Sequence, residues 1–276
     1  MSIRNNFDRV SPKDLNQDTP QPATPMSFAA PTEFVDLPSK GIGYPDGHPL
    51  RGKDVIEIKF MTAKEEDILT STTLIKKGVA IDRLLQSLIL NPDTLLVADK
   101  NAILVAARMS GYGPDYEAEM RCPNCDTKNV LNFNLGASRG IPGVVPEDSG
   151  VIALASGNYG LKLPYCGFNI ELKLLTALDE KKLTQLVMTQ VEAEQDVNLV
   201  SSQYKKMISS IEGHDDENII NAFVDSMPTV DSRQLKMIYK KVNPSFEIKD
   251  KFTCVNCKHE EEVDVPIGTN FFWPDR

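Results

Sequence analysis

Two short segments, Cys122-Pro123-Asn124-Cys125 and Cys254-Val255-Asn256-Cys257, decide how this chain folds. Each holds two cysteines separated by two residues, and the surrounding segments 116–135 and 246–265 have the pattern of strand, tight turn and strand. A turn of this kind presents two thiolates from the tip of a hairpin, and zinc prefers four such ligands in a tetrahedron. We therefore predict one structural zinc ion per chain, held by Cys122, Cys125, Cys254 and Cys257.

The two pairs are separated by 128 residues, which is far for a compact zinc ribbon. The ion would instead close a long loop, and in zinc-finger peptides a structural site contributes on the order of 10 kcal/mol to folding. Empty structural thiols and redox-active pairs are the alternatives. His259 could replace one cysteine as a ligand, although an exposed histidine beside the acidic run 260–262 is the simpler interpretation. Four thiolates leave no open position, so a catalytic zinc is not expected.

Composition restricts the classes of function. The chain has 276 residues, with 30 basic and 39 acidic side chains, a net charge of −9 and a pI near 5.0. A surface with this charge repels phosphate backbones, so nucleic-acid binding is not favoured. We also expect no membrane association, because no run approaches 18 apolar residues and the N-terminus lacks a signal-peptide core. In the cytoplasm that this implies, CxxC pairs indicate metal rather than disulfides.

The expected fold class is α+β, with helical segments and short antiparallel hairpins, two of which are CxxC zinc knuckles forming a ribbon-like metal site. We divide the chain into four regions. Residues 1–31 are proline-rich and form a disordered or partner-ordered N-terminal arm; 32–136 are an N-terminal α+β region with the first knuckle; 137–245 are an inserted hairpin-plus-helical region; and 246–276 carry the second knuckle and an aromatic C-terminus.

Local patterns place the elements within these regions. Residues 55–61 alternate as a strand, Thr62 and Glu65 form the signature of a capping box, and apolar stripes predict helices near 84–89 and over 95–109. In the insert, hairpins are expected over 151–174. Four helices should follow at about 177–193, 197–212, 216–226 and 231–241, with Asp231 and Gln234 capping the last one.

The remaining reactive residues form no catalytic pattern. The chain has three histidines, and His48 and His214 lie in loop-like settings without an obvious serine, cysteine or carboxylate constellation, so we predict no catalytic and no cofactor-binding residues. Cys166 is expected to be a small buried apolar side chain. The terminal run Phe271-Phe272-Trp273 has two interpretations that stay open. It covers the core of the second knuckle, or it is an anchor for a partner protein.

Several of these motifs resemble a known family. The run Leu37-Pro38-Ser39-Lys40-Gly41 with Tyr44-Pro45, a short strand, the helix start at 62–66 and then Cys122-Pro123-Asn124-Cys125 is similar to the baseplate hub and hub-assembly proteins of T-even-like contractile-tailed bacteriophages. The resemblance covers about residues 33–135. It implies a role in the virion tail baseplate or its assembly, in the cytoplasm of an infected bacterium, and it supplies no catalytic residues.

The leading hypothesis is therefore a structural component of a phage baseplate hub, stapled by zinc. It would act through contacts with other baseplate and tail proteins, in an oligomeric state set by the assembly. A transient hub-assembly factor absent from the virion is the first alternative. A zinc-ribbon nucleic-acid binder is the second, supported by Arg121, Lys128, Lys251 and Lys258 but opposed by Glu260–Glu262. An enzyme is not expected.

Overall fold

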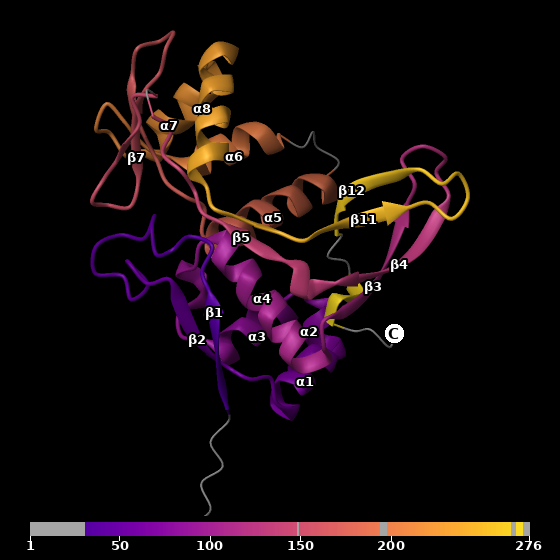
Figure 1. Ribbon diagram of the computed structural model, residues 1–276. Helices are drawn as coiled ribbons and strands as arrows, with labels where there is room; N and C mark the ends of the chain where they lie inside the picture. Colours follow the sequence, from indigo (N-terminus) through magenta and orange to yellow (C-terminus); the bar gives the residue numbers. More distant parts are fainter. Residues whose placement is uncertain (1–30, 148, 194–197, 266–268, 273–276) are drawn as a thin grey trace, which may run out of the picture. The chain divides into compact units, whose positions relative to one another are not determined.

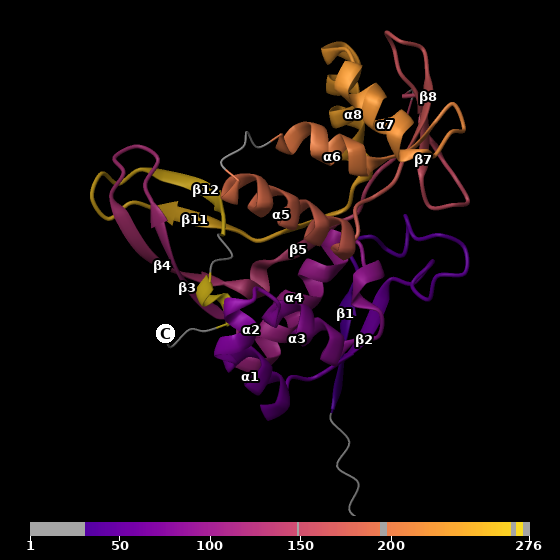
Figure 2. The ribbon, with the colours of Figure 1, turned by 180° about the vertical axis from the view of Figure 1, so that it is seen from behind.

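The computed structural model describes residues 31–147, 149–193, 198–265 and 269–272 (Figures 1 and 2). Within them the chain forms eight α-helices and five small antiparallel sheets, which confirms the expected α+β class. No helix in these ranges has the length and apolar character needed to cross a bilayer. The predicted N-terminal arm lies, apart from its last residue, outside the described residues.

The N-terminal part of the described chain consists of one β-hairpin and four helices. Strands β1 (Thr32–Asp36) and β2 (Val55–Lys59) pair in antiparallel register. The helices are α1 (Ala63–Thr70), α2 (Thr72–Lys76), α3 (Ala80–Leu88) and α4 (Val97–Tyr112), with a 3-10 turn, η1 (Pro92–Thr94), before α4. The Glu65 carboxylate accepts the Thr62 N–H at 3.0 Å, so the predicted capping box is confirmed.

A buried carboxylate on α4 fixes the long loop between β1 and β2. Asp99 accepts hydrogen bonds from the Ser39 N–H at 2.9 Å, the Ser39 hydroxyl at 2.6 Å and the Tyr44 hydroxyl at 2.7 Å. Tyr44 in turn accepts the N–H of Leu96 at 3.1 Å. Burial raises the pKa of both Asp99 and Tyr44. Three donors to one carboxylate offset part of the cost of burying it.

The inserted region combines one sheet with four helices. The sheet has the order β6 (Ile152–Ala153), β7 (Tyr159–Lys162), β8 (Asn169–Leu172) and β9 (Ile208–Ile211). The helices are α5 (Ala177–Glu192), α6 (Leu199–Met207), α7 (Glu217–Ser226) and α8 (Thr229–Val242). The hairpins predicted over 151–174 are thus present.

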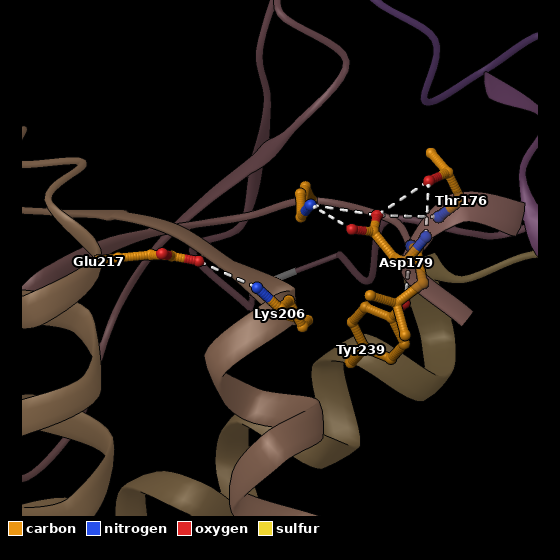
Figure 3. Close-up of polar contacts among 7 residues, drawn as sticks. Thr176, Asp179, Lys206, Glu217 and Tyr239 are labelled. Carbon is orange, nitrogen blue, oxygen red and sulfur yellow. Dashed lines mark hydrogen bonds and ion pairs between the residues drawn. The ribbon is translucent and has the colours of Figure 1, made fainter. Parts of the chain in front are cut away.

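Figure 3 shows the polar contacts that join these helices. Thr176 and Asp179 cap the start of α5, with the Asp179 N–H donating to Thr176 Oγ1 at 3.3 Å. The hydroxyl of Tyr239 on α8 accepts the Leu175 N–H at 3.1 Å, just before α5. Lys206 on α6 forms an ion pair with Glu217 on α7 at 3.0 Å. These contacts connect α5 to α8 and α6 to α7.

Two of the sequence-based predictions for this region are wrong. The helix expected over 197–212 ends at Met207, and Ile208–Ile211 is strand β9, which pairs with β8 and buries Ile208 and Ile211. Asp231 does not cap the last helix. Pro228 occupies the N-cap position of α8, and Asp231 lies in its first turn, where it is fully buried.

Asp231 holds a loop that has the same backbone hydrogen bonds as both CxxC turns. The hairpins β3 (Asp115–Arg121) with β4 (Lys128–Asn134), β7 with β8, and β11 (Lys249–Thr253) with β12 (Glu260–Asp264) all close through six residues. In each loop the first residue donates to the carbonyl of the sixth and the fifth donates to the carbonyl of the first. The fifth residue has a positive φ. These bonds span 2.8 to 3.1 Å, and the fifth residues are Asp126, Gly167 and Lys258.

In the CxxC loops, the backbone N–H groups of the third and fourth residues donate to the first cysteine's sulfur. The β7–β8 loop has Leu163 at that first position. Its corresponding N–H groups, those of Tyr165 and Cys166, instead donate to the two carboxylate oxygens of Asp231, at 2.9 and 3.1 Å. The β7–β8 loop therefore has the same backbone conformation as the CxxC loops, with a carboxylate from α8 in the position of the first cysteine's sulfur.

Replacing this carboxylate should destabilise the inserted region. We expect Asp231→Ala to lower the free energy of unfolding by about 2 kcal/mol, because two N–H groups lose their acceptor. Chemical denaturation measures the effect. Asp225→Ala, which removes an exposed carboxylate from α7, is the control and should change stability by less than about 0.5 kcal/mol. Equal stability of the two variants would contradict the role given to Asp231.

Candidate metal centre

The four predicted ligands meet at one point although they come from distant segments. The four sulfur atoms of Cys122, Cys125, Cys254 and Cys257 all lie within 4.8 Å of one another. Across the two hairpins, the sulfurs of Cys122 and Cys257 are 3.6 Å apart, and so are those of Cys125 and Cys254. In a tetrahedral site with zinc–sulfur bonds of about 2.3 Å, neighbouring sulfurs are about 3.8 Å apart. The geometry therefore fits a tetrahedral thiolate site.

The two hairpins lie side by side in both views of the ribbon (Figures 1 and 2). The sharp reversal in each CxxC loop depends on a left-handed residue directly after the second cysteine, Asp126 with φ 56° and Lys258 with φ 58°. This conformation turns the chain so that both cysteines of a loop face the same side. Each hairpin thus delivers its thiols as a pair.

Two asparagines connect the loops crosswise. Asn124, inside the first loop, has its side-chain amide 3.6 Å from the sulfur of Cys257 in the second loop. Asn256, at the matching position of the second loop, has its amide 3.8 Å from the sulfur of Cys125. Donors at this position stabilise the negative charge of a thiolate and hold it in place. Each loop therefore supplies two candidate ligands and an amide that lies beside a sulfur of the other loop.

A third asparagine, Asn129 on β4, is buried between the hairpins. Its oxygen accepts the Val255 N–H at 2.9 Å. Its amide donates to the Thr127 carbonyl at 2.7 Å and lies 3.8 Å from the sulfur of Cys254. Sequence reasoning missed all three asparagines; the shared Asn-Cys ending of the two motifs was the available signal for Asn124 and Asn256.

The electrostatic surroundings favour thiolates at particular positions. A hydrogen bond with the Thr127 side chain lowers the pKa of Cys125 to about 6. The Cys257 N–H lowers the pKa of Cys254, whereas burial raises the pKa of Cys122 to about 11. One cysteine of each hairpin thus has a lowered pKa, and a bound dication would favour loss of the other protons.

The cluster lies in a small apolar environment. Cys122, Cys254 and Phe252 are buried together, with Met120, Leu131 and Val263 packed around them. Such surroundings limit the access of water to a bound ion. With all four positions taken by sulfur, the arrangement can hold a metal but offers no free position for a substrate.

Other residues singled out in the sequence lie elsewhere. The ring of His259 faces Glu261, with 3.6 Å between Nε2 and the carboxylate. Cys166 is half-buried in the β7–β8 loop, and His48 stacks on Tyr44. Phe271 and Phe272, in the 3-10 turn η3 (Thr269–Phe272), are buried in the main core, where Phe271 packs against Tyr116 of β3. Trp273 lies outside the described residues.

The fold and the site together define an α+β protein in which two hairpins that are far apart in the sequence meet at a cluster of four cysteines. Residues 32–273 match the model of the family described as T4 bacteriophage base plate protein. Because the match spans most of the chain, this protein belongs to that family. Comparison with curated proteins gave no match, and neither did comparison with solved structures. The resemblance expected from the sequence is confirmed at the level of the family, which implies a location in the virion tail.

The buried Asn129 side chain should contribute to metal affinity. We expect Asn129→Ala to weaken zinc binding by about 10- to 100-fold, because the Asn129 side chain orients the second loop and lies beside the sulfur of Cys254. Competition with a chromophoric chelator measures this. Asn132→Ala, at an exposed position of the same strand, is the matched control and should bind as the wild type does. A matching loss in both variants would argue against a specific role for Asn129.

Proposed function

We propose that this protein is a structural component of the baseplate hub that stays in the virion and acts through contacts with other baseplate and tail proteins. Membership of the baseplate family is the observation that supports this proposal. We infer that the chain is not an enzyme. The described pockets do not contain the cysteine cluster, and its four sulfurs would saturate an ion.

The proposal includes one zinc ion per chain at Cys122, Cys125, Cys254 and Cys257. The chemistry of the donors supports zinc, because four sulfurs in a tetrahedron suit this ion and leave none of the oxygen ligands that magnesium or calcium require. In this arrangement the ion joins the two ends of the segment 126–253. The region 137–245 is then an insert whose start and end are held near each other.

A nucleic-acid role receives little support from the surface of the hairpins. Lys128 pairs with Glu119 at 2.8 Å and Arg121 pairs with Asp126 at 2.8 Å, so two of the basic side chains near the cluster are neutralised. Glu260, Glu261 and Glu262 are all exposed on β12. A phosphate backbone approaching these hairpins would meet mostly acidic groups.

Metal content tests the zinc part of the proposal. Full-length protein purified under reducing conditions without added chelator should contain about one zinc per chain by elemental mass spectrometry. Cys254→Ser should lose this stoichiometric metal during gel filtration with a mild chelator. Cys166→Ser, which removes the cysteine outside the cluster, should keep it. Wild-type protein without metal would refute the zinc site.

Particle composition tests the structural role. Quantitative mass spectrometry of purified virions should find this chain in a fixed small-integer ratio to the other tail proteins, because a structural component occupies defined symmetric positions. Absence from virions, combined with abundance in the infected lysate, would instead identify a transient assembly factor.

A further inference from the structure

The second hairpin has weak packing of its own. Strands β11 and β12 have five residues each, with Phe252 fully buried and Val263 half-buried between them and the first hairpin. Glu260, Glu261 and Glu262 are exposed, and Glu262 lies opposite Lys251, so these side chains contribute only solvent-screened charge interactions. A two-stranded hairpin of this size is at best marginally stable in water. Its position therefore depends on what it contacts.

The buried centre of these contacts is separate from the main core. Phe252 is buried with Cys122 and Cys254, while the large apolar cluster of the protein contains other residues. Met120 and Leu131 are partly buried and contact both clusters. Two hydrogen bonds that do not involve sulfur link the hairpins: the Val255 N–H donates to Asn129, and the Asn256 amide donates to the Thr127 hydroxyl at 3.2 Å. One buried phenylalanine and these two hydrogen bonds provide modest stabilisation without the sulfurs.

The two ends of the hairpin are anchored independently of the cysteines. Ile248 and Val265 are buried in the main core, and the Val265 N–H donates to the Ile248 carbonyl at 2.8 Å. Just before them, β10 (Ser245–Glu247) pairs with β5 (Arg139–Ile141). The base of the hairpin is therefore held in the main core without the cysteines.

We propose that the metal is a local clamp: β11–β12 docks on β3–β4 only when the ion is bound, and the rest of the fold persists without it. This inference rests on the proposed zinc site and assigns its regulation. Loss of the ion removes the bonds that hold the two loops together. The open arm exposes Phe252, Leu131 and Met120 to solvent.

Hydrogen exchange of the full chain tests the clamp. Zinc-loaded protein and protein freed of zinc by chelation are compared under reducing conditions, with the metal content of each sample measured in parallel. Peptides covering 249–264 should exchange at least about 100-fold faster without zinc, because this segment opens locally. Peptides of α4 and of the β7–β8 hairpin should change less than about threefold. Adding zinc back should restore the slow exchange.

Variants make the outcome decisive. Cys254→Ser should show the open pattern without a chelator, and Cys166→Ser should show the closed one. Faster exchange throughout α4 and β7–β8 would overturn the clamp, because the ion would then support the whole fold. Unchanged exchange in 249–264 after proven loss of zinc would overturn it as well. Protein that never contains zinc refutes the metal site itself, a result that the metal measurement separates from the other two.

Discussion

The hydrogen bonds to Asp99 are the constraint on which the arrangement of the chain depends. They hold the β1–β2 loop against the start of α4. The Tyr44 hydroxyl, which donates to Asp99, also accepts a hydrogen bond from the Leu96 N–H. Directly beside this point the backbone of residues 95–97 bonds to residues 175–177, with distances of 3.1 and 2.8 Å. The segments before α4 and α5 therefore meet at a backbone-paired junction, which orients α5 relative to α4 without any contribution from the cysteines.

One backbone conformation serves two kinds of acceptor in this protein. A pair of N–H groups in the CxxC loops faces a cysteine sulfur, and the same pair in the β7–β8 loop faces the carboxylate of Asp231. Both arrangements give acceptors to backbone donors in a tight turn. The difference lies in which segments the acceptor connects. Asp231 connects the loop to α8, whereas the four cysteines come from two hairpins separated by 128 residues.

The sequence was sufficient where the signal is local. The CxxC spacing identified the cluster, the capping residues of α1 were correct, and Asp216 begins α7 at the predicted boundary. It failed where tertiary contacts decide. Ile208 and Ile211 fit a helical stripe as well as a strand, and only pairing with β8 selects the strand. Asp231 looked like a cap because its acceptor role requires a loop 65 residues away. The likeness of Leu163-Pro164-Tyr165-Cys166-Gly167 to the first CxxC loop was present in the sequence, but it becomes meaningful only once the hydrogen bonds are seen.

The C-terminal segment is attached to the body at three places, and this decides what the metal can control. The first attachment is the pairing of β5 with β10. The last is η3, where the buried guanidinium of Arg108 donates to the Phe271 carbonyl at 2.6 Å. The same guanidinium also donates to the carbonyls of Gly113 and Asp115, at 2.8 and 3.0 Å. Between them lies the β11–β12 hairpin, whose docking is assigned to the metal. Because the outer two attachments are made of backbone pairing and core packing, they would persist after loss of an ion from the proposed site, and only the arm between them would open.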